Sequence, residues 1–450
     1  MPSSRRLTRR QLRTRESPVP GDFALFVQRN LHRQEASGAM LLIAAAAALA
    51  IANSPWSEAF SSFWHHTIPI DLKYFEISLD LRHWINDALM ALFFFQIGLE
   101  IKRELIMGEL SEIRKAMFPA IAAIGGMVLP VGIFLAWTAG SDGTQGWAVP
   151  MATDIAFALG VLALLGDRIS PKARVFLLTL ATVDDIGSIL VIAIVFTSDL
   201  SWAALGASLI PVGIILILRY LGVRLISPYF IAGILLWVGI LRSGIHPTIA
   251  GVIVGLLIPA KPRISHEEFL GAVPEAIEEL EKRVEQEQEE EAEGILGEIE
   301  QYVDETISPV ERLEYHIRPW VSYIVLPLFA LANAQFEISL GGLGEAITKP
   351  VTLGIATGLL LGKPIGTLLF GWSAEKLGVG TPPEGVDWKD VIGIGMIAGI
   401  GFTVSLFIAN LAFSESELIH NAKLGILIGS VLSAIAGTGF LFFRSAQEKE

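Results

Sequence analysis

Several ionisable side chains stand deep inside long apolar stretches of the chain. They are Asp154, Asp184, Asp185 and Lys363, and Thr153 places a hydroxyl directly before Asp154. A charged group at the centre of a bilayer costs about 2.5–3.5 kcal/mol on insertion scales, so such groups usually serve a function. One buried carboxylate alone could be a helix-packing group. Three carboxylates and a lysine in three separate stretches indicate a site.

Asp184 and Asp185 are neighbours, and consecutive residues of a helix point about 100° apart. The two carboxylates therefore face different neighbours, so one can pair with Lys363 while the other faces an aqueous cavity. Hard cations such as Na⁺ and Li⁺ prefer oxygen ligands, which carboxylates and the Thr153 hydroxyl supply. A desolvated carboxylate close to a like charge also holds a proton more tightly. Competition between Na⁺ and H⁺ for one carboxylate is the core of an exchanger.

The composition indicates that lipid surrounds these stretches. Of 450 residues 52% are hydrophobic and 18% charged, with a mean hydropathy of +0.56, whereas soluble domains carry about 25% charge. The chain has no cysteine, which excludes disulfides, thiolate metal sites and cysteine nucleophiles. The net charge of −13 is local, because residues 265–311 hold 17 acidic and 2 basic side chains.

Apolar runs between short polar loops predict twelve membrane spans. Each must be helical, because the bilayer interior leaves backbone groups no other hydrogen-bond partner. Alternate loops, beginning with the N-terminal arm, hold 27 Lys and Arg residues against 5 in the other loops. The positive-inside rule then places both termini of this multi-pass membrane protein in the cytoplasm. The predicted spans lie near 38–52, 84–101, 116–138, 148–165, 174–197, 202–220, 226–241, 244–259, 318–335, 350–371, 390–412 and 422–443.

Five regions follow from this pattern. We expect a basic, disordered cytoplasmic arm at 1–35, spans 1–8 in 36–259, an acidic cytoplasmic loop at 260–317, spans 9–12 in 318–443 and a cytoplasmic tail at 444–450. In the acidic loop, Ile277, Leu280 and Val284 at helical spacing favour a solvated amphipathic helix, and a regulatory or partner-binding segment is the alternative. In the first external loop, residues 70–81 alternate partly, which is compatible with a small β-hairpin or an irregular loop.

Two predicted spans carry signs of an interrupted backbone. Residues 393–403 are rich in glycine, and the span near 148–165 begins at Pro150 and contains the polar pair Thr153-Asp154. A pair of Gly- or Pro-interrupted helices is typical of the midplane site of a transporter. Glycines in a span can also serve only close helix packing.

Three classes of protein remain to be compared: a secondary antiporter, a cation channel and an intramembrane aspartyl protease. The protease would pair two carboxylates as acid and base, but the chain lacks Tyr-Asp and Gly-x-Gly-Asp motifs, and Lys363 has no role in that chemistry. A channel would carry Na⁺ independently of protons. The antiporter is favoured, so we expect no enzymatic activity, no cofactor beyond the transported ions and no nucleic-acid partner.

The motifs that carry these residues resemble the NhaA family of Na⁺/H⁺ antiporters. They occur in the expected order through most of residues 36–443. The matching stretches are Trp84–Met90, Gly98–Leu105, Ala152–Phe157, Asp184-Asp185, Gly244–Gly251, Gly362–Pro364 and Gly399–Thr403.

The resemblance implies an inverted-repeat transporter with two broken helices that cross near Thr153-Asp154, where charged groups offset facing helix-end dipoles. It implies that Asp184 and Asp185 bind the cation and the proton, with Lys363 partnering Asp184. It also implies electrogenic exchange of internal Na⁺ or Li⁺ for external H⁺, activation at alkaline pH, and a homodimer in membrane lipid joined through the first external loop.

The resemblance further assigns a pH response to a second group of side chains. The chain departs from the family pattern at Tyr315–Arg318 and in the length of its acidic insert. Both differences lie beside this group, so they bear on the pH set point rather than on the exchange chemistry. Asp87, near the external end of its span, is a further intramembrane acid. The implied pH-response residues are Glu100, Arg103, Glu104, His246 and Glu314.

Overall fold

The computed structural model describes residues 34–72, 75–197, 199–286, 288–336 and 343–447. The first helix, α3 (Gln34–Ala52), begins two residues before the predicted membrane region. The last, α22 (Ser416–Gln447), extends into the predicted tail. The disordered arm is predicted at residues 1–35. Residues 1–33 lie outside the described ranges, and residues 34–35 already belong to α3.

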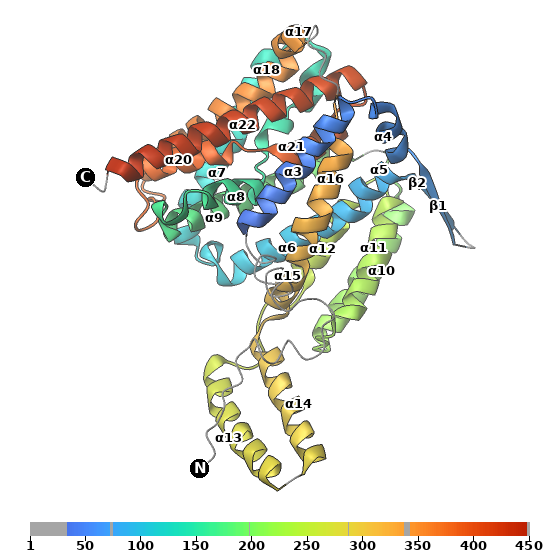
Figure 1. Cartoon of the computed structure of the whole chain (residues 1–450), viewed down its shortest axis with the longest axis vertical. Helices are drawn as coiled ribbons and strands as arrows, with labels where there is room; N and C mark the ends of the chain where they lie inside the picture. Colours follow the sequence, from blue (N-terminus) through green and yellow to red (C-terminus); the bar gives the residue numbers. More distant parts are fainter. Residues whose placement is uncertain (1–33, 73–74, 198, 287, 337–342, 448–450) are drawn as a thin grey trace.

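Every predicted span falls on helical structure, and the helices pack into one layered body (Figure 1). Short helices α4 (Ser57–Trp64), α5 (Leu81–His83) and α17 (Leu343–Thr348) lie in the connections. The other helices of the body are α6 (Met90–Met107), α7 (Ile113–Thr138), α8 (Ile155–Ala163), α9 (Pro171–Val195), α10 (Trp202–Tyr220), α11 (Ile226–Leu241), α12 (Thr248–Leu257), α15 (Pro309–Trp320), α16 (Leu326–Asn333), α18 (Pro350–Thr357), α19 (Lys363–Lys376), α20 (Trp388–Ala398) and α21 (Phe402–Ala412).

The length and composition of the described helices define a multi-pass membrane protein. Six continuous helical segments are long and apolar enough to cross a membrane alone. The number rises to nine if each of three bent helix pairs is one span, while α11 and α12 are apolar but shorter. The predicted count of twelve spans and the inverted repeat stay predictions.

Two of the bent pairs are the spans that the sequence marked as interrupted. A short 3₁₀ turn, η4 (Val149–Met151), is followed by three extended residues before α8 begins, and this pair bends by 48°. Helices α20 and α21 also meet at 48°, across residues 399–401. Gly401 fits here because a Cβ on it would lie 3.1 Å from the Ala152 carbonyl oxygen of the other break.

Proline shapes two further helices. The π-helical turns η6 (Val321–Val325) and η7 (Gly358–Gly362) each end just before a proline, at Pro327 and Pro364. Proline has no N–H and its ring clashes with the carbonyl four residues earlier, so the helix must adjust there. Such π-bulges often occur at functional sites, and η7 leads directly into Lys363.

Helices α7 and α19 approach each other closely beside this turn. Gly125 and Gly366 face each other, and a Cβ on either would collide with the other's carbonyl oxygen. Small residues at a helix interface allow such an approach in lipid, where packing rather than hydrophobicity joins helices. This contact holds the helix that carries Lys363.

The first external loop contains a β-hairpin, which decides between the two predicted alternatives. Strands β1 (Thr67–Leu72) and β2 (Phe75–Asp80) pair antiparallel, from Thr67 opposite Asp80 to Leu72 opposite Phe75. The hairpin therefore begins three residues earlier than the predicted range. Residues 73–74 at its tip lie outside the described part of the chain.

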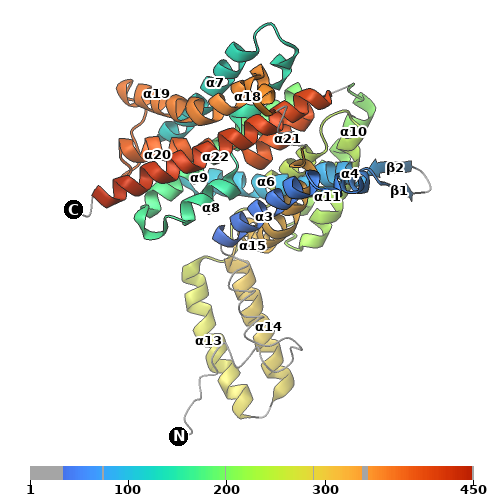
Figure 2. The ribbon, with the colours of Figure 1, turned by 45° about the horizontal axis from the view of Figure 1, so that its top comes forward.

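The acidic loop contains two helices rather than the single predicted one. Helices α13 (His266–Glu285) and α14 (Glu289–Thr306) form a hairpin that protrudes from the body (Figures 1 and 2). Its ends are joined because the backbone N–H groups of Arg263 and Ile264 both donate to the Glu305 carbonyl. A third helix, α15, begins within the predicted 260–317 loop at Pro309 and carries Glu314.

Local capping explains where this acidic hairpin begins. The Ser265 hydroxyl accepts a hydrogen bond from the Glu268 backbone N–H, and the Ser265 N–H donates to the Glu268 carboxylate. This capping box satisfies two backbone donors that the helix itself leaves free. The Ser265 backbone N–H also holds the pKa of Glu268 below its usual range.

Candidate ion-binding site

Asp184, Lys363 and Thr153 meet at the centre of the body. Lys363 Nζ lies 2.5 Å from Asp184 Oδ2, and both side chains are fully buried. The Thr153 hydroxyl donates to the same oxygen at 2.8 Å. The contact expected between Lys363 and Asp184 is therefore present, and it joins α19, α9 and the break before α8. The other oxygen, Asp184 Oδ1, is buried without a hydrogen-bond partner among the described residues.

Asp185 lies on the other side of α9, as the helical geometry requires. Its side chain is 3% exposed and makes neither a hydrogen bond nor an ion pair with any described residue. It lines a cavity of about 80 Å³, together with Glu100 of α6 and Arg318 of α15. An ionised carboxylate that is buried without a partner is strongly destabilised. Binding of a proton or a small cation removes that penalty.

Asp154 joins the two broken spans. Its Oδ1 accepts from the Phe157 backbone N–H at 2.9 Å, which caps the start of α8. Its Oδ2 accepts from the Thr403 backbone N–H at 2.9 Å and from the Thr403 hydroxyl at 2.5 Å, at the start of α21. Both helices present positive N-terminal ends here, and one carboxylate offsets both. These three donors, from the starts of both helices, occupy both oxygens of Asp154.

The chain itself connects the two breaks through backbone groups. The Asp154 N–H donates to the Ile400 carbonyl at 2.7 Å, and the Thr153 hydroxyl also lies 2.8 Å from the Ala398 carbonyl. A hydroxyl has one proton, so Thr153 donates either to Ala398 or to Asp184. Ser405 adds a hydrogen bond to the Val149 carbonyl at 2.8 Å. The crossing is thus closed by groups of both spans.

The sequence analysis did not select Thr403 or Ser405 as site residues. Thr403 ends the glycine-rich motif Gly399–Thr403, so its place in that motif was a usable signal. Ser405 carries no comparable signal, because a serine in an apolar helix most often bonds within its own helix. Only the crossing brings its hydroxyl to Val149, 256 positions away.

Four of the five predicted pH-response residues lie close together. Glu100 and Glu104 are buried on α6, and Glu314 is buried on α15. Arg103 NH2 lies 3.6 Å from Glu104, and Arg103 Nε lies 3.4 Å from Glu314. Arg318 forms an ion pair with Glu314 one helical turn earlier. Because Glu100 and Arg318 line the Asp185 cavity, this acid–base cluster adjoins the candidate ion site.

His246, the fifth residue, lies apart from that cluster. Its Nε2 is 3.6 Å from Asp87 Oδ1, and its Nδ1 is 2.8 Å from the Thr248 hydroxyl. The structure thus brings together His246 and the additional intramembrane acid Asp87, which the sequence could not pair. The ring also packs edge-on against Phe407 of α21.

A second buried polar network escaped the sequence analysis. Asn333 Oδ1 accepts from Arg82 Nε at 3.2 Å and from Asn410 Nδ2 at 3.1 Å, while Asn333 Nδ2 donates to Asn86 Oδ1 at 2.7 Å. The network joins the helix of Arg82 and Asn86 to α16 and α21. Asparagine carries no strong pattern in an apolar helix, so only the packed helices reveal that these four side chains meet.

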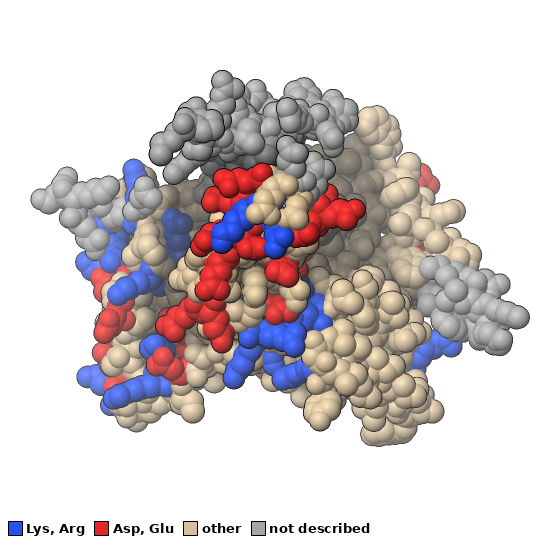
Figure 3. Space-filling model, turned by 90° about the horizontal axis from the view of Figure 1, so that it is seen from below, with Lys and Arg blue, Asp and Glu red and all other residues tan. Residues whose placement is uncertain are grey.

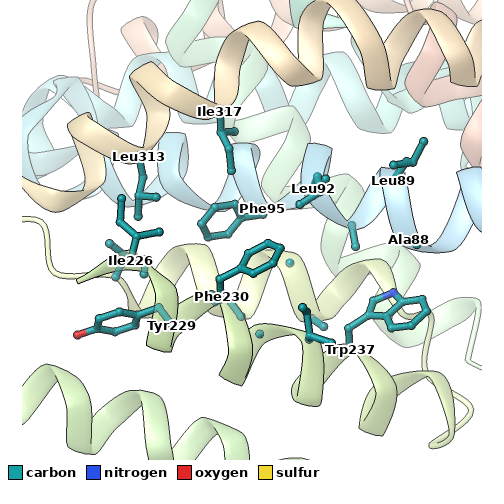
Figure 4. Close-up of a pocket in the computed structure, with 17 residues that line it drawn as sticks. Ala88, Leu89, Leu92, Phe95, Ile226, Tyr229, Phe230, Trp237, Leu313 and Ile317 are labelled. Atoms are coloured by element: carbon teal, nitrogen blue, oxygen red, sulfur yellow. The ribbon is translucent and has the colours of Figure 1, made fainter. Parts of the chain in front are cut away.

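A larger cavity, of about 340 Å³, is apolar and lies away from the ion site (Figure 4). Phe95 of α6, Phe230 and Trp237 of α11, and Leu313 and Ile317 of α15 line it. This mostly aliphatic and aromatic lining is unsuited to a hard cation, which prefers several oxygen ligands. Within the described residues there is also no group of three or more His, Asp or Glu side chains that could hold a resident metal.

The fold and the site define a multi-pass membrane transporter. Apolar helices surround two broken spans that face each other, and buried carboxylates lie at their crossing. This is the arrangement by which secondary transporters hold ions near the bilayer midplane.

Comparison with known proteins gives the family. The Na⁺/H⁺ antiporter 1 family matches residues 28–441. The protein is 44% identical over 427 residues to the Na⁺/H⁺ antiporter NhaA 2 of Syntrophotalea carbinolica, covering 92% of this chain and 96% of the relative. It is 44% identical over 415 residues to the Na⁺/H⁺ antiporter NhaA of Rhodopirellula baltica, covering 92% and 93%. The chain therefore belongs to the NhaA family of Na⁺/H⁺ antiporters, as its motifs predicted.

Proposed function

We propose that the protein is a secondary antiporter that exchanges internal Na⁺ or Li⁺ for external H⁺ across the cell inner membrane. The observation that carries this proposal is Asp185, a carboxylate that is 3% exposed, has no partner among the described residues and faces a cavity. Such a group requires a cation, and a proton and a sodium ion compete for it. The names of the relatives, both Na⁺/H⁺ antiporters, agree with this function.

Asp184 supplies the second half of the proposed site. Its unpartnered Oδ1 can ligate the ion, while its Oδ2 is held by Lys363 and Thr153. The lysine charge stabilises the Asp184 carboxylate when no metal ion is bound. When Na⁺ enters, it replaces protons at the carboxylates of the site. After Na⁺ leaves, these carboxylates can take up protons from the other side of the membrane. Exchange of more protons than sodium ions would make the cycle electrogenic.

The two broken spans provide the movement that exchange requires. Only a few hydrogen bonds hold residues 152–154 against 399–401, since neither segment is part of a helix. Asp154 keeps the two helix N-termini together while the bonds of Thr153 change between Asp184 and Ala398. Access to Asp185 then alternates between the two sides by rocking about this crossing.

The remaining parts of the proposal concern regulation and assembly. The cluster of Glu100, Arg103, Glu104 and Glu314 adjoins the Asp185 cavity, which supports a role in activation at alkaline pH. His246 would act separately, through Asp87. The β-hairpin extends beyond the helical body (Figure 2), which supports its proposed role in joining two copies of the chain. We propose no cofactor and no catalytic reaction.

The test is the substitution Asp185→Asn. It removes the anionic ligand and the proton carrier but keeps the side-chain size, so insertion and folding should survive. In everted vesicles, Na⁺-induced dissipation of an imposed pH gradient should vanish at every pH tested. Sodium binding followed by calorimetry should fall below detection, while the unmodified protein should release protons as Na⁺ binds.

The matched control is Asp87→Asn. It also removes an intramembrane carboxylate, but a partly buried one that is paired with His246 away from the site, so it should retain some exchange. Near-normal exchange by Asp185→Asn would show that competition at this carboxylate is not the mechanism. A Na⁺ flux that needs no proton gradient and releases no proton would assign the protein to the channels instead.

A further inference from the structure

Two segments of opposite charge flank the helices around the Asp185 cavity. Residues 1–33 contain eight arginines and two acidic residues. The acidic hairpin and its base, residues 265–311, contain 17 acidic and 2 basic residues. Neither charge is used by the proposed exchange mechanism.

The negative charge of the hairpin is mostly uncompensated. Lys282 and Arg283 are paired within it, with Glu278 at 2.9 Å and with Glu279 and Glu291 at 2.8 and 2.5 Å. Most other acidic side chains are exposed and form no ion pair with any described residue. Figure 3 views the molecule from the hairpin end, where these acidic side chains gather in one area. They include Glu275, Glu281, Glu290, Glu293, Glu298 and Glu300.

The points where the two segments join the body lie close together. The arm continues into α3, whose Ser37 lines the Asp185 cavity. The hairpin continues into α15, whose Arg318 lines the same cavity. An extended chain spans at most about 3.3–3.6 Å per residue, so 33 residues reach on the order of 100 Å. The hairpin helices, at 20 and 18 residues, are roughly 30 Å long, so the arm can reach all of their surface.

We propose that the N-terminal arm binds the acidic hairpin of the same chain. Its first six arginines, at positions 5, 6, 9, 10, 13 and 15, stand without an intervening acid and match the exposed glutamates of α13 and α14. The attachment through α3 makes the encounter intramolecular, which for short flexible linkers gives effective concentrations in the millimolar range.

This contact is sensitive to salt because exposed charges carry it. The distance over which such charges act is about 10 Å at 0.1 M salt and roughly 3 Å at 1 M. The arm is therefore bound at low ionic strength and released at high ionic strength. A rise in salt on the hairpin side therefore weakens this contact, which makes the arm and the hairpin a sensor of ionic strength.

The absence of cysteine from the natural chain permits a direct test. The double variant Arg9→Cys with Glu298→Cys, purified in neutral detergent, is treated with a flexible bismaleimide at low salt and at about 1 M KCl. Intramolecular cross-linking should be fast at low salt and about tenfold slower at high salt, where charge interactions are screened. The control Arg9→Cys with Glu384→Cys places the second thiol on an exposed glutamate outside the hairpin, and it should cross-link slowly in both conditions.

A charge variant completes the test. Replacement of the five other arginines among the first six of the arm by glutamine should lower the low-salt cross-linking rate of the Arg9–Glu298 pair to that of the control. Equal rates in the two pairs, or a rate that neither salt nor the glutamine variant changes, would overturn the proposal. A cross-linked product that contains two chains would show that the arm binds the hairpin of a second copy. Loss of the cross-link in nanodiscs of anionic lipid, but not in nanodiscs of neutral lipid, would show that the arm binds the membrane surface. Either of these two results would also overturn the proposal.

Discussion

Lys363 and Asp184 form the most deeply buried ion pair in the described part of the chain, with both side chains at 0% exposure. In low-dielectric surroundings such a pair is sensitive to the loss of one partner, because the remaining charge stays buried and uncompensated. The same geometry leaves Asp184 Oδ1 free. The pair therefore links the stability of the fold to the state of the ion site.

At this scale we expect Lys363→Ala to lower both thermal stability and exchange. Removing one member of a buried pair costs about 3–5 kcal/mol, so the melting temperature in detergent should fall clearly. Adding Asp184→Asn should restore much of the stability, because no uncompensated charge is left, while exchange should stay low. Lys376→Ala is the control, since that lysine lies at the end of the same helix. Its Nζ lies 5.9 Å from the centroid of the Trp372 ring, in a cation–π contact. An unchanged melting temperature for Lys363→Ala would argue against the pair.

At the scale of the elements, close packing of helices holds these residues in place. Gly125 and Gly366 bring α7 and α19 together, and Gly366 lies three residues after Lys363. The crossing of the broken spans depends in the same way on Gly401, which lies against the Ala152 carbonyl. At Gly125 and Gly366 an added methyl group would press on backbone, which cannot move aside as a flexible side chain can. At Gly401 it would meet the Ser405 hydroxyl first, at 2.2 Å, and then Leu359 and the Ala152 carbonyl.

Gly366→Ala should therefore separate α19 from α7 and displace Lys363. We expect a lower melting temperature and reduced Na⁺-dependent exchange in everted vesicles. Gly132→Ala is the control, because Gly132 lies in α7, the helix against which α19 packs, and a Cβ there meets nothing within 4 Å. That change should be neutral or slightly stabilising, since glycine in a helix costs about 0.5–1 kcal/mol relative to alanine. Equal behaviour of the two variants would contradict this account of the interface.

The acidic hairpin differs from the packed helices of the body, because in the described part of the chain it protrudes and joins the body at its base (Figures 1 and 2). Arg263 and Ile264 donate to the Glu305 carbonyl, so residues 266–304 can be replaced by a short Gly-Ser linker without stretching the chain. Maximal exchange should be retained, and at most the pH profile should shift. A normally inserted protein that no longer transports would show that the hairpin belongs to the transport machinery.

At the scale of the whole molecule, charge distribution sets the orientation in the membrane. One set of alternate loops, which includes both termini and the acidic hairpin, holds 27 Lys and Arg residues, and the other set holds 5. This difference predicts that both termini and the hairpin lie in the cytoplasm. A C-terminal reporter enzyme that works only after export should therefore be inactive, while one that works only in the cytoplasm should be active. The opposite pair of results would rule out a twelve-span topology with internal termini.

Much of this protein could be predicted from local patterns in the sequence. Apolar runs marked the helices because membrane burial requires continuous apolar stretches, and glycine, proline and Thr153-Asp154 marked the two breaks. The buried acids and Lys363 stood out because charges are costly in lipid. For the same reason the site residues were visible before any packing was known. Family motifs added the partnership of Lys363 with Asp184.

The tertiary structure decided how these pieces meet. It showed that Asp154 caps two helices whose starts lie about 250 positions apart and that Asn333 gathers Arg82, Asn86 and Asn410 into one network. It placed His246 beside Asp87 rather than with the glutamates. It also divided the acidic loop into two helices. Local sequence patterns report on one helix at a time, whereas these contacts depend on the packing of helices distant in the chain.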